Sequence, residues 1–316
     1  MIQVKNLTKL YGTHLAVDDI SFKVKRGHIY GFLGPNGAGK STTMNMLTGY
    51  IAPTAGSIVI NGHEMGVETL EAKKCIGYLP ENPPLYPDMS VKEYLDFVAK
   101  LKKLPRDTRQ EEIVHIMKQT GIADVSERLI KNLSKGYKQR VGIAQALLGK
   151  PEVIILDEPT VGLDPKQMKE IRNLIKGLKG KHTVILSSHI LSEISAVCDD
   201  VLMIANGKVA AMDTTENILT KNQGGLHLTV TVKGEAVKAE AILKKLKCIK
   251  KVSLVSEEKN KATFAVEAKR SKKDVREEIS FALSDARILI IEMSVEKASL
   301  EDAYLDIVHE GQEEEE

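Results

Sequence analysis

Two patterns of apolar residues predict two kinds of strand in the first part of the chain. Val153–Leu156 is a run of four apolar residues, and His28–Leu33 is apolar over most of its length. Runs of this kind are typical of strands buried on both faces, as in a parallel sheet. Apolar and polar residues instead alternate at Val4 and Asn6 and over Ile20–Val24. This alternation predicts antiparallel strands with one exposed face.

Helical spacing predicts the elements between these strands. Thr42–Gly49 carries apolar residues and ends at a glycine, which is typical of a short helix. Ser90–Glu93 has the sequence of a capping box, and apolar residues recur at helical spacing through Val98. We therefore expect an α/β fold that includes a helical subdomain over about residues 88–140.

The last third of the chain predicts a second, smaller domain. Apolar and polar residues alternate over Leu226–Val232, and the predicted elements from there on follow in the order βαββαβ. This order is typical of a ferredoxin-like α+β sandwich. Ser299 and Asp302 then form a capping box for a last helix. The predicted organisation is a first domain over 1–218, a linker over 219–225, an α+β domain over 226–309 and an acidic tail over 310–316.

Composition narrows the class of protein. With 42% hydrophobic and 28% charged residues, the 316-residue chain has the balance of a water-soluble globular protein. Its net charge of +2 gives no argument for a nucleic-acid partner. No apolar run approaches the ~20 residues of a transmembrane helix. The cysteines, Cys75, Cys198 and Cys248, lack any paired spacing, so we expect free thiols.

A glycine-rich segment predicts a phosphate-binding loop. Gly34–Thr42 has two glycines separated by four residues and followed by Lys and Ser, between a predicted strand and a predicted helix. Backbone N–H groups and the helix N-terminus would cradle phosphates. Lys40 would reach the β- and γ-phosphates, and the Ser41 hydroxyl would ligate Mg²⁺. The residues predicted to contact the nucleotide here are Asn36, Gly37, Gly39, Lys40, Ser41 and Thr42.

Two carboxylates follow the buried strand Val153–Leu156. Asp157 and Glu158 are adjacent, and burying unpaired negative charge is costly. A bound cation beside a phosphate would explain them. We expect Asp157 to act on the Mg²⁺ side and Glu158 to be the base that orients the attacking water.

The segment Leu133–Arg140 reads LSKGYKQR and resembles the signature motif of ABC ATPases, usually written LSGGQ. Lys135 and Tyr137 depart from the motif, whereas Ser134 and Gly136 match it. The resemblance implies a RecA-like core, an antiparallel β subdomain and a helical subdomain. It also implies that Ser134 and Gly136 face the γ-phosphate bound by a second subunit.

Further motifs occur in the order of this family. Tyr11 resembles the aromatic residue that stacks on adenine, and Asp164, in Gly162–Pro165, resembles the D-loop acid. His189 resembles the switch histidine that contacts the γ-phosphate and the water. Glu81 stands where most of the family has Gln, a difference common in the ABC-2 exporter branch; its oxygen could ligate metal or contact nucleotide.

The resemblance implies Mg²⁺-dependent ATP hydrolysis that drives an ABC-2-type exporter. The catalytic residues would be Lys40, Glu158 and His189, and the metal ligands Ser41, Glu81 and Asp157. The partners would be a second ATPase subunit, identical or different, and an integral-membrane permease at the cytoplasmic face of the membrane. A membrane-associated regulatory or motility complex driven by the same ATPase is an alternative. A P-loop kinase or GTPase is disfavoured because the guanine-specifying NKxD string is missing. The transported substrate stays open.

Overall fold

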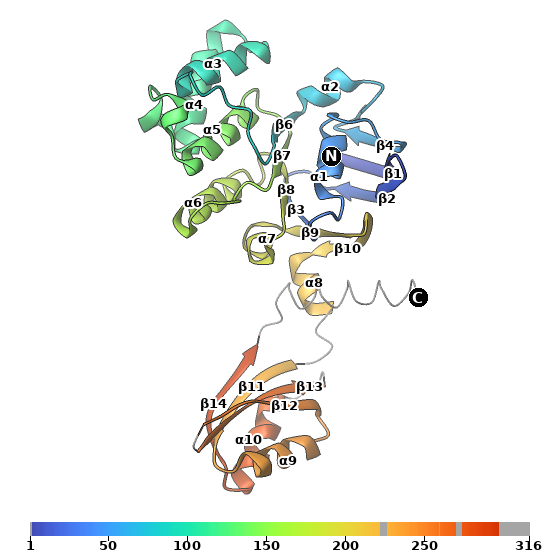
Figure 1. The fold of residues 1–316 in the computed structure, drawn as a ribbon, viewed down its shortest axis with the longest axis vertical. Coiled ribbons are helices and arrows are strands. Elements are labelled where there is room, and N and C mark those ends of the chain that lie inside the picture. The colour runs from blue at the N-terminus through green and yellow to red at the C-terminus, as the bar shows by residue number, and fades with distance from the viewer. Residues whose placement is uncertain (1, 222–225, 259, 270–273, 297–316) are drawn as a thin grey trace. The chain divides into compact units, whose positions relative to one another are not determined.

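The computed structural model describes residues 2–221, 226–258, 260–269 and 274–296, and they form two compact units (Figure 1). The first unit runs to Thr215 and the second begins at Glu216, slightly before the boundary expected at 218. The predicted linker over 219–225 starts inside helix α8 (Thr215–Lys221). The predicted last helix and the acidic tail lie outside the described residues.

The core of the first unit is a parallel sheet whose described strands run in the order β10-β9-β3-β8-β7-β6. The neighbours from β9 to β6 pair in parallel, and β10 pairs antiparallel with β9. Every residue of β3, β7 and β8 is buried, which confirms the prediction from the apolar runs at β3 and β7. The strands are β3 (Ile29–Leu33), β6 (Ile76–Leu79), β7 (Val153–Asp157), β8 (Thr183–Ser188), β9 (Asp200–Ala205) and β10 (Lys208–Thr214).

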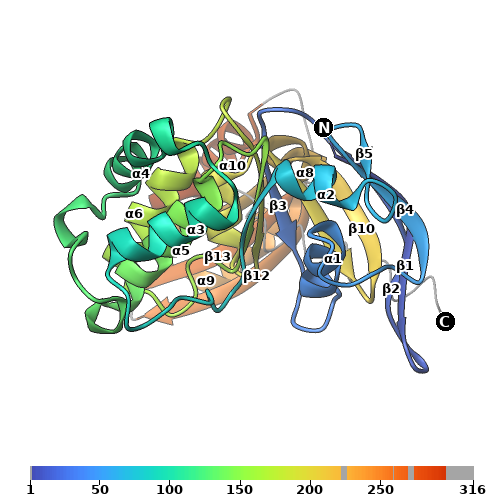
Figure 2. The same cartoon turned by 90° about the horizontal axis from the view of Figure 1, so that it is seen from above.

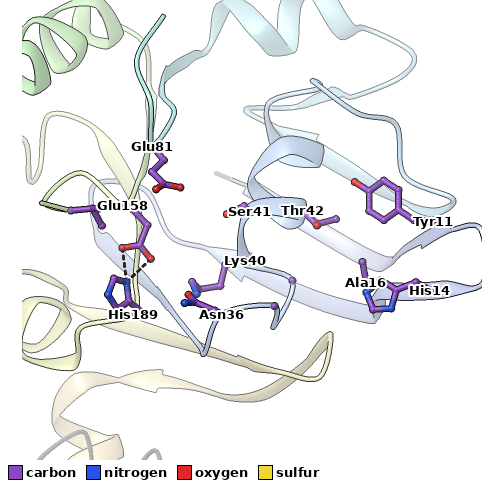
Figure 3. Close-up of a pocket in the computed structure, with 13 residues that line it drawn as sticks. Tyr11, His14, Ala16, Asn36, Lys40, Ser41, Thr42, Glu81, Glu158 and His189 are labelled. Atoms are coloured by element: carbon purple, nitrogen blue, oxygen red, sulfur yellow. Dashed lines mark hydrogen bonds and ion pairs between the residues drawn. The ribbon is translucent and has the colours of Figure 1, made fainter.

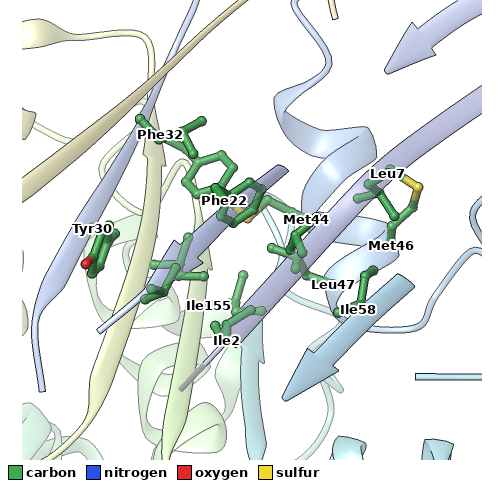
Figure 4. Close-up of a cluster of buried hydrophobic side chains, with 14 of the residues drawn as sticks. Ile2, Leu7, Phe22, Tyr30, Phe32, Met44, Met46, Leu47, Ile58 and Ile155 are labelled. Atoms are coloured by element: carbon green, nitrogen blue, oxygen red, sulfur yellow. The ribbon is translucent and has the colours of Figure 1, made fainter. Parts of the chain in front are cut away.

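An antiparallel sheet packs on this core through helix α1 (Lys40–Leu47). Figure 4 shows the buried side chains between them, where the rings of Phe22 and Phe32 meet edge to face at 5.4 Å. This packing joins the hairpin β1–β2 firmly to the segment that follows β3. The antiparallel sheet consists of β1 (Ile2–Tyr11), β2 (His14–Val24), β4 (Ala55–Ile60) and β5 (His63–Glu64), and α2 (Thr69–Lys74) follows it.

The helices α3 (Val91–Leu101), α4 (Arg106–Thr120) and α5 (Lys135–Leu147) pack on one another and form the predicted helical subdomain (Figure 2). The capping box of α3 is confirmed: the Ser90 hydroxyl accepts the Glu93 N–H at 3.3 Å, and the Glu93 carboxylate accepts the Ser90 N–H at 2.8 Å. The remaining helices of this unit are α6 (Pro165–Lys176), α7 (Leu191–Val197) and the short 3-10 helices η1 (Ala123–Val125) and η2 (Ile130–Asn132). Among the described residues no helix is long and apolar enough to cross a membrane.

The second unit has the βαββαβ order that the sequence predicts. Its strands form an antiparallel sheet in the order β12-β13-β11-β14. A separate core, centred on the fully buried Phe264, includes residues from both helices and from the sheet. The elements are β11 (Leu226–Lys233), α9 (Ala236–Lys245), β12 (Ile249–Glu258), β13 (Lys261–Ala268), α10 (Val275–Asp285) and β14 (Leu289–Glu296).

This separate core leads to a testable difference between two phenylalanines. Phe264 is 0% exposed and Phe281 is 70% exposed. Phe264→Ala should destabilise the second unit by about 3–5 kcal/mol, because it leaves a cavity. Phe281→Ala should change stability by no more than about 0.5 kcal/mol. Differential scanning calorimetry of the full chain measures both, and equal effects of the two substitutions would contradict the assigned core.

Candidate functional site

The glycine-rich loop between β3 and α1 has the backbone that its sequence predicts. Gly39 is the N-cap of α1, with φ of 100° in the left-handed region that favours glycine. A Cβ at this position would lie 2.6 Å from the Ala16 carbonyl oxygen on β2. Glycine therefore lets the loop both turn into the helix and approach the neighbouring strand.

A cavity of about 450 Å³ opens beside this loop. Figure 3 shows residues from the loop, the β1–β2 hairpin and the carboxyl ends of β6, β7 and β8 around it. Ligand sites of open α/β sheets lie at this edge. The lining residues are Tyr11, His14, Ala16, Asn36, Gly37, Gly39, Lys40, Ser41, Thr42, Glu81, Glu158, Val161 and His189.

Lys40 is held at the base of the cavity. Its ammonium donates hydrogen bonds to the carbonyl oxygens of Gly34 at 2.8 Å and Pro35 at 3.1 Å. Burial lowers the pKa of the Lys40 ammonium, and the Glu158 and Asp157 carboxylates partly counteract this effect. The lysine thus places a positive charge between the loop and the two acids.

Asp157 lies behind the cavity wall, whereas Glu158 is part of the wall. The Ser187 hydroxyl joins the two residues: it donates to the Asp157 carboxylate at 2.5 Å and accepts the Glu158 N–H at 2.8 Å. Glu158 has φ of 48°, which is rare for a residue with a side chain. The bond from Ser187 helps to hold this strained backbone. Sequence reasoning missed Ser187, and its only signal is its place two residues before His189.

The His189 imidazole contacts the Glu158 carboxylate across the cavity floor. His189 Nδ1 lies 3.1 and 3.0 Å from the two carboxylate oxygens of Glu158 (Figure 3). The Glu158 side chain is 10% exposed and that of His189 is 45% exposed. The carboxylate is therefore oriented from one side and open to the cavity on the other, as a proton acceptor requires.

The β1–β2 hairpin forms the far wall of the cavity. Tyr11 is 47% exposed and pairs with His14 at the hairpin end. The Lys9 ammonium lies 5.1 Å from the centre of the Tyr11 ring. An exposed aromatic ring that lines the same cavity as the phosphate loop suits a stacked base. Sequence reasoning predicted Tyr11 but missed the lining residues His14, Ala16 and Val161, which carry no motif signal.

Glu81 enters the cavity from the loop after β6. In the part of the chain that the structure describes, no group of three or more His, Cys, Asp or Glu side chains could hold a metal ion alone. Mg²⁺ usually takes one or two carboxylates and completes its shell with phosphate oxygens and water. Ser41 and Glu81 offer oxygens in the cavity lining, whereas Asp157 lies outside this lining.

Three predicted nucleotide contacts lie outside this cavity. Ser134 is the N-cap of α5, where its hydroxyl accepts the Tyr137 N–H at 3.4 Å. Asp164 is the N-cap of α6, where it accepts the Gln167 N–H at 2.9 Å. A Cβ at Gly136 would lie 2.7 Å from the Gln167 side chain. The starts of α5 and α6 are thus packed together and form a second group of predicted contacts.

The two departures from the signature motif have local partners. The Tyr137 hydroxyl donates to Asp124 at 3.0 Å, and the Arg140 guanidinium lies 5.8 Å from the centre of the Tyr137 ring. The side chain of Tyr137 therefore makes these contacts within the helical subdomain. A Cβ at Gly162 would meet the Lys135 ammonium, so Lys135 lies over the loop that leads to α6.

Comparison with curated proteins finds relatives over nearly the whole chain. The linearmycin resistance ATP-binding protein LnrL of Bacillus subtilis is 32% identical over 97% of this chain and 98% of its own length. The bacitracin transport ATP-binding protein BcrA of Bacillus licheniformis is 40% identical over 75% of this chain and 77% of its own length.

Solved structures and a family model agree with these relatives. An ATP-binding subunit of an ABC transporter has a TM-score of 0.64 and 31% identity, and the match covers 70% of this chain and 92% of that one. A dimeric bacterial ABC transporter cassette, MJ0796, has a TM-score of 0.62 and 26% identity over 68% of this chain and 98% of its own. Residues 17–161 match the ABC transporter family model. The chain therefore belongs to the ATP-binding proteins of ABC transporters and is an ATPase.

Proposed function

We propose that this chain is the ATP-hydrolysing subunit of an ABC-2-type exporter and works on the cytoplasmic face of the membrane through a separate integral-membrane permease. Relatives named for linearmycin resistance, bacitracin transport and lantibiotic transport support an exporter. Glu81 in place of the usual Gln supports the ABC-2 branch. The substrate would be recognised by the permease.

The division of the predicted contacts into two groups is the observation that carries the proposed mechanism. The cavity holds Tyr11, Lys40, Glu158 and His189, whereas Ser134, Gly136 and Asp164 lie outside its lining. A head-to-tail dimer would bring the second group of one subunit against the cavity of the other. Two ATP molecules would then be held between subunits, and the dimeric cassette MJ0796 supports such an assembly.

Each ATP site would then be composite, with residues from both subunits. The role of each residue follows from its position in that site. Tyr11 would stack on the base, and the loop N–H groups and Lys40 would bind the phosphates. Ser41, Asp157 and Glu81 would hold Mg²⁺, which would neutralise charge on the phosphate oxygens. Glu158 would accept a proton from the attacking water, and His189 would keep the Glu158 carboxylate oriented.

The role of Glu158 is tested by Glu158→Gln. The amide keeps the size of the side chain but cannot accept the proton, so hydrolysis should fall at least about 100-fold. ATP binding should be retained, and an ATP-bound dimer should accumulate in size-exclusion chromatography. Single-turnover hydrolysis at the wild-type rate would remove Glu158 from this role.

The composite dimer is tested by mixing two inactive variants. Lys40→Ala should abolish activity by weakening phosphate binding, and Ser134→Arg should abolish it by blocking the opposite site. A mixed dimer then contains one site with both defects and one intact site. The mixture should therefore recover hydrolysis, whereas each variant alone should not. If mixing recovers none, although cross-linking detects mixed dimers, the composite site is wrong.

The exporter assignment is tested by affinity purification from membranes with Glu158→Gln as bait. We expect one integral-membrane protein to copurify in a fixed ratio, and ATPase activity of the wild-type complex in vesicles to rise with a transported solute. Copurification without stimulation by any solute, but with stimulation by a soluble regulatory partner, would favour a regulatory or motility complex instead.

A further inference from the structure

A buried carboxylate behind the cavity joins the two turns that carry Glu158 and His189. Glu193 on α7 is 3% exposed and does not line the cavity. Its Oε2 atom accepts hydrogen bonds from the Thr160 hydroxyl at 2.5 Å and from the Ser188 hydroxyl at 3.2 Å. Thr160 is 4% exposed and Ser188 is 0% exposed. Both donors are therefore shielded from water.

Each of these hydroxyls belongs to a turn that contains one of the two residues assigned to hydrolysis. The Ser188 Oγ also accepts the Ile190 N–H at 3.0 Å, and this bond encloses the backbone of His189. Thr160 lies in the turn that the Val161 N–H closes onto the Glu158 carbonyl oxygen at 3.2 Å. A shift of either hydroxyl would consequently move one of the two side chains.

The two carboxylate oxygens of Glu193 differ in their surroundings. Within the part of the chain that the structure describes, the Oε1 atom of Glu193 is buried and has no hydrogen-bond partner. Burial of a carboxylate costs free energy, which the hydrogen bonds from Thr160 and Ser188 offset in part. Unlike an apolar residue, Glu193 supplies one hydrogen-bond acceptor that two hydroxyl groups share.

We propose that Glu193 is a positioning residue for ATP hydrolysis: by binding Thr160 and Ser188 together, it keeps His189 within hydrogen-bond distance of Glu158. The Ser187 hydroxyl joins the ends of β7 and β8 through Asp157 and Glu158. Glu193 joins the turns that follow these two strands through Thr160 and Ser188. Glu193 is not among the residues that line the cavity. The proposal rests on the proposed roles of Glu158 and His189.

The deciding experiment removes the Thr160 hydroxyl at nearly constant volume. Thr160→Val should lower kcat about tenfold or more, because small displacements of reacting groups slow chemistry strongly. KM and the ATP affinity of Thr160→Val should stay within about twofold of wild type, since Thr160 does not line the cavity. The matched control, Thr160→Ser, restores the donor and should recover most of kcat.

Two outcomes would overturn the proposal. One is a wild-type kcat for Thr160→Val. The other is a Thr160→Ser variant as slow as Thr160→Val, which would assign the effect to packing rather than to the hydroxyl. Glu193→Gln keeps an oxygen acceptor and Glu193→Leu does not, so the first should be the faster of the two whenever both bind ATP.

A second substitution distinguishes this proposal from a general loss of structure. In a His189→Ala background the contact that Glu193 supports is already gone, so Thr160→Val should slow single-turnover hydrolysis by a smaller factor than in the wild-type background. Equal slowing in both backgrounds would contradict the positioning role. Wild-type hydrolysis by Glu158→Gln would instead refute the proposed base, a result independent of Thr160→Val.

Discussion

The parallel pairing of β7 with β8 is the constraint on which the rest of the site depends. Its register sets Asp157 opposite Ser187, so the residues that follow, Glu158 and His189, leave the sheet side by side. The pairing of β3 with β8 sets Leu33 opposite Ser188 and starts the phosphate loop at the same edge. Three chain segments far apart in sequence therefore meet because parallel strands end together.

The strands at this edge carry buried polar groups that are stabilised by hydrogen bonds and by opposite charge nearby. Asp157 is 5% exposed, yet its carboxylate accepts the Ser187 hydroxyl and lies near the Lys40 ammonium. Glu158 adopts a left-handed backbone and is bound through both its N–H and its side chain. The positions of Asp157 and Glu158 therefore depend on β8 as well as on β7, the strand that carries them.

The sequence predicted most of the fold and the motif residues, because those signals are local. The phosphate loop, the capping box at Ser90 and the βαββαβ order of the second unit depend on patterns within a few residues. The bonds of Ser187 to Asp157 and of Thr160 to Glu193 join residues that are 30 and 33 positions apart. No local pattern marks such pairs, and they become visible only once the strand register is known.

The separate core of the second unit has a consequence for comparison with related proteins. Among the residues that the structure describes, the core of Phe264 and the core around Phe32 and Met44 have no buried residue in common. Each core is therefore built from residues of its own unit. The similarities reflect this: LnrL aligns over 97% of the chain, whereas the ATP-binding subunit of known structure aligns over 70%. The cassette and the second unit are thus two separately packed parts of one chain.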